Sequence, residues 1–374
     1  MMKPLFPRAA LWCRLALTAA LACASLGAFA QSVRPQTVAG GLDHPWAVAF
    51  LPQGGYLVTE RPGRMRLVSA DGKLGAPLIG VPEVVARGQG GLLDVVLDSD
   101  FARNRVLYFC FSQPGEGGNS TALARAKLGT DNARLDEVRV IFSQKPKFAS
   151  NQHFGCRIAE ARDGTLFLTL GDRFSRMQDA QTLDNHHGKI VRVNKDGSVP
   201  KDNPFVNRAG ALPEIWSYGH RNAQGGALAP DGTFWMHEHG PQGGDEINVP
   251  QPGRNYGWPV ITFGENYGGG KIGEGLTAKA GMEPPVHYWV PSIAPSGMAF
   301  LTSDRYGAAL KGNLFVGSLK FSYLARLELD GRKVTRETRF AEVGARVRDV
   351  RQGPDGLLYV LTDESDGKLL RLVP

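Results

Sequence analysis

Hydrophobic residues occur along this chain in short segments where apolar and polar side chains alternate, and Gly, Pro, Asn or Asp stand at the ends of these segments. Alternation with period two is typical of β-strands, and the bounding residues are typical of tight turns. We find no long segment with the period of an amphipathic helix. One pattern, a turn of the Asp-Gly type followed by an alternating strand, recurs at residues 52–58, 104–109, 163–168, 231–236, 311–316 and 355–360.

A second turn and strand follow most of these copies, as at residues 62–68, 188–193 and 367–372. Each copy is therefore a hairpin unit of the kind that builds a propeller blade. The spacing of the copies is too irregular for a solenoid, but it suits a propeller whose connecting loops carry insertions. A pair of stacked sheets would not explain why the same hairpin returns near both ends of the chain. The sequence therefore predicts an all-β fold, a six-bladed β-propeller.

The first 30 residues have the pattern of a secretory signal. Three basic residues come first, residues 15–26 are apolar but too short to cross a bilayer, and residues 28–30 read Ala-Phe-Ala. We expect cleavage there, export to the periplasm and a single propeller domain over residues 31–374. A lipoprotein anchored at Cys23 is the alternative. Beyond this signal, no apolar run reaches the roughly 20 residues of a membrane helix, so no membrane span is expected.

Charge and cysteine content exclude several classes. Without the signal, 40 Lys and Arg stand against 36 Asp and Glu, and the two signs are interspersed, so we expect no nucleic-acid partner. Only Cys110 and Cys156 remain, which is neither a disulfide framework nor a zinc pattern. In an oxidising compartment they could form a disulfide if the fold brings them close. For the whole protein we expect a monomer or a weak homodimer.

Loops at one end of a propeller converge and can build a site together. The loops of interest are therefore those with polar residues that a turn does not need. Gln89 lies among three glycines, His153 stands before a strand, and Asp172 follows the next strand. His153 could be a base, a metal ligand or a structural residue. The pair Arg221 and Asn222 offers guanidinium and amide donors that suit a planar ligand with carboxylates or carbonyls, although an arginine can also serve only to hold the backbone.

Two further histidine pairs are candidates. His186 and His187 are adjacent, and neighbouring side chains on an extended segment point in opposite directions, so they are less suited to one ligand. The pair His237 and His239 could bind zinc. However, the carbonyls of residues 240–241 and the carboxylates that follow are hard oxygen ligands, which favours calcium.

Near the end of the chain, Arg346 and Arg348 lie on the same face of a strand because side chains alternate. Two like charges side by side need an anion between them, and Lys320 would complete a cationic cup for a polycarboxylate. These loops together predict a planar, polyanionic, calcium-bound ligand beside a histidine base. Pyrroloquinoline quinone (PQQ), a tricarboxylate ortho-quinone, meets this description.

Three motifs in combination carry a resemblance to a known family: Gly-His-Arg-Asn at 219–222, Glu-His-Gly-Pro at 238–241 with Gly-Asp-Glu at 244–246, and Arg-Val-Arg-Asp at 346–349. The chain resembles the PQQ-dependent glucose/sorbosone dehydrogenases, and among them the periplasmic aldose sugar dehydrogenases. The resemblance covers essentially the whole chain after the signal.

The resemblance implies oxidation of an aldose at C1 to the lactone and an external electron acceptor of unknown identity. It implies that His153 is the base, that Asp172 supports it and that Arg221 stabilises negative charge on the quinone. PQQ would contact His153 and Arg221 and be held by Gln89, Asn222, Tyr267, Lys320, Arg346 and Arg348. The carbonyls of Gly240 and Pro241 would bind one calcium, and a second, structural calcium would be bound by Glu246, Tyr256 and Asp245.

The chain departs from the family pattern at two places. Gln152 precedes the base where the soluble glucose enzymes carry Asp, which puts the tuning of His153 in doubt. The loops after Tyr267 and at residues 173–176 are short, which predicts an open site and a broad sugar range.

Two other functions are alternatives. A calcium-dependent propeller lactonase would leave Lys320, Arg346 and Arg348 without an anion. A propeller that only binds proteins would not need His153 or the Arg221–Asn222 pair.

Overall fold

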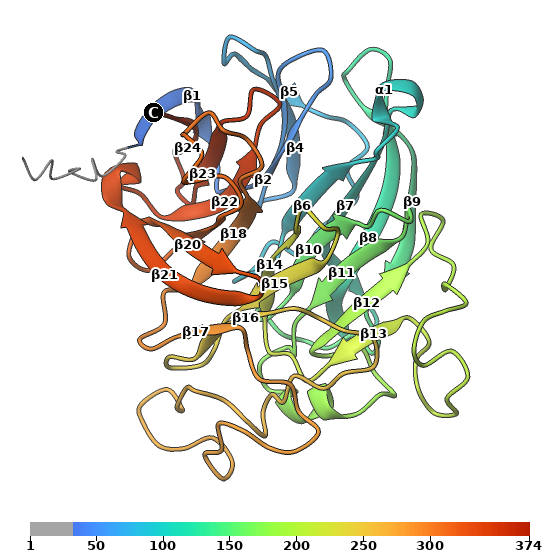
Figure 1. Ribbon diagram of the computed structural model, residues 1–374. Helices are drawn as coiled ribbons and strands as arrows, with labels where there is room; N and C mark the ends of the chain where they lie inside the picture. Colours follow the sequence, from blue (N-terminus) through green and yellow to red (C-terminus); the bar gives the residue numbers. More distant parts are fainter. Residues whose placement is uncertain (1–32) are drawn as a thin grey trace, which may run out of the picture. The chain divides into compact units, whose positions relative to one another are not determined.

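The computed structural model describes residues 33–374, so the predicted signal at residues 1–30 lies outside the described residues. The described part forms six four-stranded antiparallel sheets arranged as the blades of a propeller, which confirms the predicted fold class (Figure 1). Three short helical segments accompany the strands: α1 (Phe101–Asn104), η1 (Met177–Gln181) and η2 (Ala341–Val343).

Each blade is a meander of consecutive strands, and the bounds of the first three blades are as follows. Blade 1 contains β2 (Pro45–Phe50), β3 (Tyr56–Glu60), β4 (Arg64–Val68) and β5 (Leu74–Pro77). Blade 2 contains β6 (Leu92–Leu97), β7 (Val106–Gly115), β8 (Gly118–Leu128) and β9 (Leu135–Ser143). Blade 3 contains β10 (Gly155–Glu160), β11 (Leu166–Leu170), β12 (Lys189–Val193) and β13 (Ile215–Tyr218).

The other three blades complete the ring. Blade 4 contains β14 (Ala223–Leu228), β15 (Phe234–Glu238), β16 (Asp245–Asn248) and β17 (His287–Trp289). Blade 5 contains β18 (Pro295–Phe300), β19 (Leu314–Ser318), β20 (Leu324–Asp330) and β21 (Lys333–Phe340). Blade 6 contains β22 (Val347–Gln352), β23 (Leu358–Thr362), β24 (Gly367–Val373) and β1 (Arg34–Leu42). In blade 6, Arg34 pairs with Val373, so strands from opposite ends of the described chain share one sheet.

The six recurring hairpin copies lie at β3, β7, β11, β15, β19 and β23, which are the second strands of the blades. They are therefore not the strands that line the centre. The innermost strands are β2, β6, β10, β14, β18 and β22, which contact one another around the centre. They approach very closely: a Cβ on Gly297 of β18 would lie 2.2 Å from the backbone nitrogen of Val350 of β22. A small residue is therefore required at this position. Small residues interrupt the alternation of apolar and polar side chains by which a strand is recognised in the sequence.

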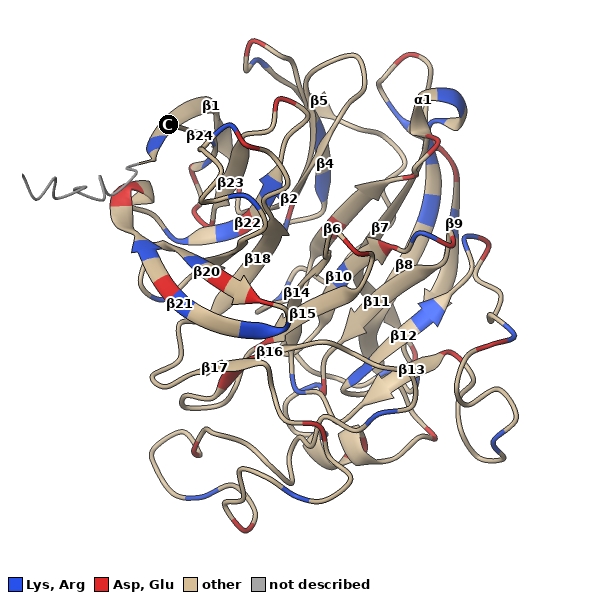
Figure 2. Ribbon diagram, viewed as in Figure 1, with Lys and Arg blue, Asp and Glu red and all other residues tan. Residues whose placement is uncertain are grey.

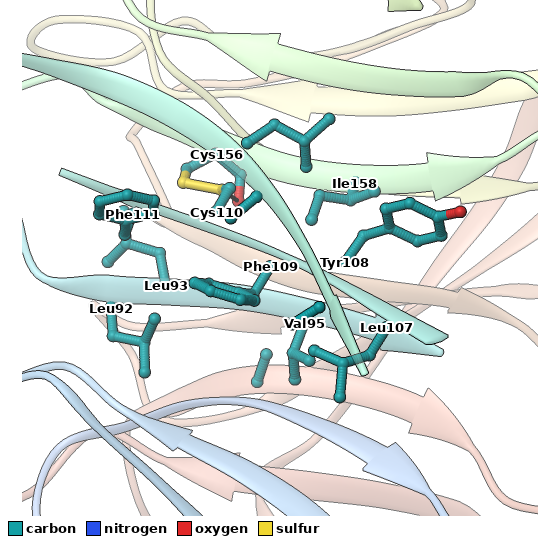
Figure 3. Close-up of a cluster of buried hydrophobic side chains, with 14 of the residues drawn as sticks. Leu92, Leu93, Val95, Leu107, Tyr108, Phe109, Cys110, Phe111, Cys156 and Ile158 are labelled. Carbon is teal, nitrogen blue, oxygen red and sulfur yellow. Dashed lines mark hydrogen bonds between the residues drawn. A yellow bond between two sulfur atoms is a disulfide. The ribbon is translucent and has the colours of Figure 1, made fainter. Parts of the chain in front are cut away.

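The core lies between neighbouring blades. Figure 3 shows part of it, where side chains from β6, β7 and β10 pack together. The second strands β3, β11, β15, β19 and β23 are buried along their whole length, because a blade faces another blade on each side. Burial of this apolar area is the main force that stabilises the ring.

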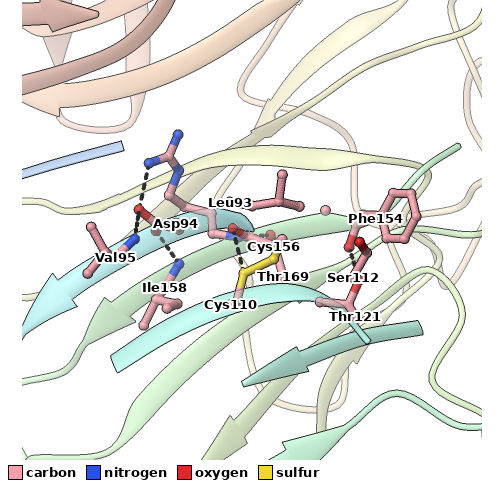
Figure 4. The surroundings of a disulfide bond; sticks show 12 residues. Leu93, Asp94, Val95, Cys110, Ser112, Thr121, Phe154, Cys156, Ile158 and Thr169 are labelled. Atoms are coloured by element: carbon pink, nitrogen blue, oxygen red, sulfur yellow. Dashed lines mark hydrogen bonds and ion pairs between the residues drawn. A yellow bond between two sulfur atoms is a disulfide. The ribbon is translucent and has the colours of Figure 1, made fainter. Parts of the chain in front are cut away.

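Cys110 and Cys156 form a disulfide between β7 of blade 2 and β10 of blade 3, with Cα atoms 5.8 Å apart (Figure 4). The fold brings the two cysteines close, so the disulfide that the sequence left open is formed. Cys110 stands in the middle of β7. The bond joins two blades covalently and is buried in the core.

The centre of the propeller holds a buried network of opposite charges. Arg157 of β10 lies 3.0 Å from carboxylate oxygens of both Asp94 and Asp349. Arg351 of β22 reaches the same two carboxylates, at 2.7 and 3.0 Å. Asp94 also accepts the backbone N–H of Ile158 at 2.8 Å, as Figure 4 shows. These contacts link blades 2, 3 and 6, and the four charges balance one another.

Charges on the outer strands and loops are of both signs and interspersed, as Figure 2 shows. Among the helices of residues 33–374, none is long and apolar enough to cross a membrane.

Candidate active site

Loops that enter the innermost strands at one end of the propeller carry five of the predicted site residues. Gln89 precedes β6, His153 precedes β10, and Arg221 with Asn222 precedes β14. Arg346 immediately precedes β22. Since the innermost strands are neighbours around the centre, these loops meet although they are far apart in sequence.

His153 and Asp172 form a buried pair. Nδ1 of His153 lies 2.5 Å from Oδ1 of Asp172, and Oδ2 of Asp172 accepts a 2.7 Å hydrogen bond from Nε1 of Trp258. A carboxylate can only accept, so Nδ1 of His153 carries the proton and Nε2 is the proton acceptor of the ring. Burial lowers the pKa of His153, while the contact with Asp172 raises it in part. The imidazole is therefore neutral at pH 7, as a general base must be.

The backbone that carries His153 is held in an uncommon conformation. His153, Gly155 and Cys156 have φ angles of 53°, 64° and 77°. A non-glycine residue in this left-handed region costs free energy and persists only where its surroundings fix it. Here the backbone N–H of His153 donates to Oε1 of Gln89 at 3.0 Å, and the disulfide holds Cys156.

Gln89 and Asn222 connect the base to the next loop. Oδ1 of Asn222 accepts the backbone N–H of Gly155 at 3.2 Å. Its Nδ2 lies 3.5 Å from Oε1 of Gln89, which also accepts from His153. The structure therefore brings these three predicted residues together.

Arg221 reaches the loop that follows β15. Its Nη1 donates to the carbonyls of His239 at 3.1 Å and Gly240 at 2.6 Å, and its Nη2 lies 3.4 Å from the hydroxyl of Tyr267. Its backbone N–H donates to the carboxylate of Glu238. Within residues 33–374, the buried Nε of Arg221 has no hydrogen-bond partner. A buried donor without a partner is costly, so this atom is suited to meet a ligand.

Arg346 and Arg348 both contact the carboxylate of Asp363, so the protein itself supplies the anion between them. Nη2 of each lies 3.0 Å from Oδ2 of Asp363. Burial opposes ionisation of Asp363, but the two guanidinium groups lower its pKa to about 2. The expectation that a ligand must supply the anion between the arginines was therefore wrong. The buried Nε of Arg348 still has no partner among the described residues, and the side chain of Arg346 is half exposed.

A hollow of about 500 Å³ adjoins these residues. Lys320, Tyr267, Gly240 and Pro241 line it, together with other residues of the loops around them. Arg346 lies next to Lys320, because its Nη1 donates to the carbonyl of Leu319 at 2.9 Å. The predicted cationic residues and the predicted calcium-binding carbonyls are thus close together.

Asp245 has a different role from the one predicted. Its Oδ1 accepts the backbone N–H of Gly240 at 2.9 Å. Its Oδ2 accepts from the hydroxyl of Ser292 at 2.6 Å and from the backbone N–H groups of Ile293 and Ala294 at 2.8 and 2.9 Å. These four donors occupy the carboxylate, so Asp245 fastens the loop before β18 to the loop at Gly240. We remove it from the calcium ligands.

Glu246 faces a second buried carboxylate, that of Glu238. Nδ2 of Asn248 donates to both, at 3.2 and 3.0 Å. Burial, and next the charge of Glu238, raises the pKa of Glu246 well above its usual value. Both acids line a cavity of about 10 Å³ with Tyr256, which has room for a single ion. Two buried carboxylates of this kind are suited to a hard cation such as calcium.

Tyr256 cannot offer its hydroxyl to that cavity without losing contacts. The hydroxyl donates to the carbonyl of Val249 at 2.6 Å and accepts the backbone N–H of Gln251 at 2.9 Å. The group that Tyr256 can offer a cation is therefore its backbone carbonyl.

Comparison with known proteins identifies the family. The sequence model for Glucose / Sorbosone dehydrogenase matches residues 42–371. The chain belongs to this family. The aldose sugar dehydrogenase YliI of Escherichia coli (strain K12) is 47% identical over 355 residues, which are 94% of this chain and 95% of that protein.

Solved structures agree with this assignment. The soluble aldose sugar dehydrogenase of Escherichia coli, in the apo form, has 47% identity and a TM-score of 0.88, covering 92% of this chain and all of that one. The PQQ-bound aldose sugar dehydrogenase of Streptomyces coelicolor has 29% identity and a TM-score of 0.76, with 91% and 98% coverage. This member of the glucose/sorbosone dehydrogenase family is thus a dehydrogenase, which disfavours the lactonase and the binding module.

Three histidines of the other two pairs in this dehydrogenase have structural partners, whereas neither ring nitrogen of the buried His237 has a hydrogen-bond partner among residues 33–374. His186 contacts Glu214 at 3.4 Å, and His187 contacts Asp179 at 2.8 Å. Nε2 of His239 lies 2.5 Å from the carbonyl of Pro295. Across residues 33–374, no three His, Cys, Asp or Glu side chains are grouped to hold a metal, so zinc at His237 and His239 is not supported.

Sequence reasoning gave no role to several residues that shape this site. Trp258 orients Asp172, Asp363 holds the two arginines, and Glu238 faces Glu246. A signal was present only for Glu238, which stands within a family motif. Trp258 and Asp363 act across loops whose proximity the sequence does not reveal.

Proposed function

We propose that this dehydrogenase oxidises aldose sugars at C1 to the lactone with PQQ and calcium. The observation that carries the proposal is the buried His153–Asp172 pair. Its Nε2 is a proton acceptor in the loops that enter the innermost strands, where Arg221 and Arg346 also lie. A PQQ-bound relative supports the choice of cofactor, as does the quinoprotein glucose dehydrogenase B of Acinetobacter calcoaceticus, 27% identical over 94% of this chain.

The residues present fit a planar tricarboxylate. The Nε atoms of Arg221 and Arg348 are buried donors that lack a partner in the described part of the chain. Lys320 lines the adjoining hollow and Arg346 is half exposed, so both can reach a carboxylate. Gln89, Asn222 and Tyr267 complete the proposed set of PQQ contacts.

When bound, PQQ would supply the quinone that accepts a hydride and calcium the Lewis acid that polarises it. His153 would take the proton of the C1 hydroxyl at Nε2, and Asp172 would stabilise the resulting imidazolium through Nδ1. Arg221 would present its donors to the negative charge that develops in the site. Trp258 keeps Asp172 oriented, so the ring of His153 stays in the productive tautomer.

Calcium fits two places in this chain. Gly240 and Pro241 line the same hollow as Lys320. The carbonyl of Gly240 accepts one hydrogen bond from Arg221 and keeps a second lone pair for an ion. The cavity at Glu238 and Glu246 provides two hard carboxylates for a structural ion. We therefore propose Glu246, Glu238 and the carbonyl of Tyr256 for the second site.

The cellular setting is part of the proposal. Residues 1–30 have the pattern of a cleaved signal, so we propose a periplasmic enzyme that passes electrons to an external acceptor. The half-exposed Phe174 and the exposed Tyr267 flank the site, which is consistent with an open entrance and a broad sugar range. We propose a monomer or weak homodimer.

A spectroscopic titration tests the function. The purified protein is titrated with PQQ in the presence of calcium while the absorbance of the quinone is followed, and D-glucose is then added. We expect a saturable change on binding and a second change, reduction, on adding the sugar. A dye acceptor then allows a screen of other aldoses. A lactonase or a binding module would leave the quinone spectrum unchanged by the sugar, and that result would refute the proposal.

A further inference from the structure

Phe174 is a large apolar side chain that lies exposed beside the base. It is 45% exposed, and its ring centroid is 5.4 Å from that of His153, with the two rings nearly perpendicular. An aromatic side chain of this size usually contributes most by being buried. Its exposure next to a catalytic base indicates that it contacts something that enters the site.

The protein holds Phe174 in a costly backbone conformation. Arg173 and Phe174 are consecutive residues with φ angles of 60° and 66°. Two neighbouring non-glycine residues in the left-handed region require support from their surroundings. Oδ1 of Asp172 provides it by accepting the backbone N–H of Phe174 at 2.8 Å. The carboxylate that orients His153 therefore also fixes the turn that carries the Phe174 ring.

The side chain of Arg173 also holds this turn in place. It is fully buried, and its guanidinium donates to the carbonyls of Ser150 at 2.8 Å and Gln152 at 3.0 Å. It also lies over the ring of Phe154, 3.9 Å from the centroid. Phe174 therefore has a fixed position relative to His153, and this position does not depend on burying the ring.

A polar hollow lies close to the turn that carries this ring. A hollow of about 670 Å³ is lined by Arg87, Asn119, Ser150 and Asn151, among others. The hydroxyl of Ser150 donates to the carbonyl of Arg173 at 3.2 Å, which joins this hollow to the Phe174 turn. A pyranose has an apolar face of C–H groups and a rim of hydroxyls. The fixed aromatic face matches the first part, and the amide, hydroxyl and guanidinium groups of the hollow at the Arg173–Phe174 turn match the second.

We propose that Phe174 is the platform on which the apolar face of the oxidised pyranose ring rests, so that it sets the affinity for aldoses. The inference rests on the proposed function, because it takes His153 as the base for the same sugar. It identifies a residue that positions the substrate and not one that holds the cofactor. Substrate affinity, and not the rate of the chemical step, should therefore depend on the ring.

The test uses the full protein reconstituted with PQQ and calcium. Phe174→Ala removes the ring, Phe174→Tyr keeps it, and Val140→Ala shortens a comparably exposed apolar side chain on the outer strand β9. With D-glucose and a dye acceptor, Phe174→Ala should raise KM about tenfold, the effect of losing the contact area of one aromatic side chain. Phe174→Tyr and Val140→Ala should retain the wild-type KM.

Three results would overturn the inference. One is a wild-type KM in Phe174→Ala. Another is a loss in kcat with a shifted pH profile, since the ring would then only support His153. The third is weaker PQQ binding in the absorbance titration, since the ring would then contact the cofactor. If wild-type protein itself fails to reduce PQQ with glucose, the proposed function has failed and not the assignment of Phe174.

Discussion

The contact between His153 and Asp172 determines what a substitution at position 153 should do. His153→Gln has a similar size but cannot accept the proton. We expect turnover to fall by about 10² to 10⁴, as for loss of a general base. PQQ affinity should change little, because other residues bind the cofactor. The measurement is single-turnover reduction of the quinone, with the melting temperature of the same sample.

A purely structural role for His153 predicts the opposite result. The protein would then lose folding stability but keep near-normal turnover in the folded fraction. Arg346→Ala is the matched comparison, since it should weaken PQQ binding while His153 remains in place. Reduction by His153→Gln within about threefold of wild type would exclude His153 as the base.

The direction of the pKa shift at His153 predicts the pH dependence. The base must be neutral, and burial lowers its pKa below 6.5. The neutral fraction of His153 should therefore stay high when the pH is lowered to 6.5. It should decline, and kcat/KM with it, only at pH values below 6.5. Asp172→Asn should move this decline to still lower pH, because the Asp172 charge raises the pKa. A wild-type decline that begins well above pH 6.5 would contradict the assignment.

The sequence predicted those site residues whose chemistry is visible in a local motif. Arg346 and Arg348 were found because they alternate along one strand. Their true partner, Asp363, follows a different strand, and only the register of β22 against β23 brings it near. For Asp245 the residue type suggested a calcium ligand, but four hydrogen-bond donors from distant loops already occupy it. Local sequence does not reveal such partners.

At the scale of elements, the disulfide between β7 and β10 should stabilise the fold. It closes a loop between residues 46 apart in sequence, and a loop of this length corresponds to about 4 kcal/mol in the chain-entropy model. The double variant Cys110→Ser with Cys156→Ser should therefore unfold at a lower urea concentration. Val140→Ala serves as the surface control. An unchanged midpoint would mean that the bond contributes nothing to the free energy of unfolding.

Strands could be predicted from the sequence where a turn precedes a segment of alternating apolar and polar residues. The second strands met this condition, so their six copies gave the number of blades. Four of the innermost strands, β2, β10, β14 and β18, contain glycine or alanine, and at Gly297 the neighbouring backbone is too close for a side chain. Alternation is then lost, and sequence alone could not tell which strand of each hairpin faces the channel.

For the whole molecule, calcium should affect both stability and activity. An ion that binds only the folded state stabilises it by about 2.7 kcal/mol at a hundred times its dissociation constant. We expect excess chelator to abolish activity and lower the melting temperature. Glu246→Gln should lower the melting temperature more than it weakens PQQ binding. An identical melting curve with and without chelator would remove the structural ion from the proposal.

The pairing of β1 with β24 also constrains the order of folding. Blade 6 is completed by a strand from residues 34–42 and strands from residues 347–373. Contacts between such distant segments form slowly, because a very long loop must first be closed. The ring cannot close until β24 has been made, so β1 stays without its partner strand while the intervening blades are synthesised. The closed propeller therefore forms after β24 has been synthesised and not while the earlier blades are being made.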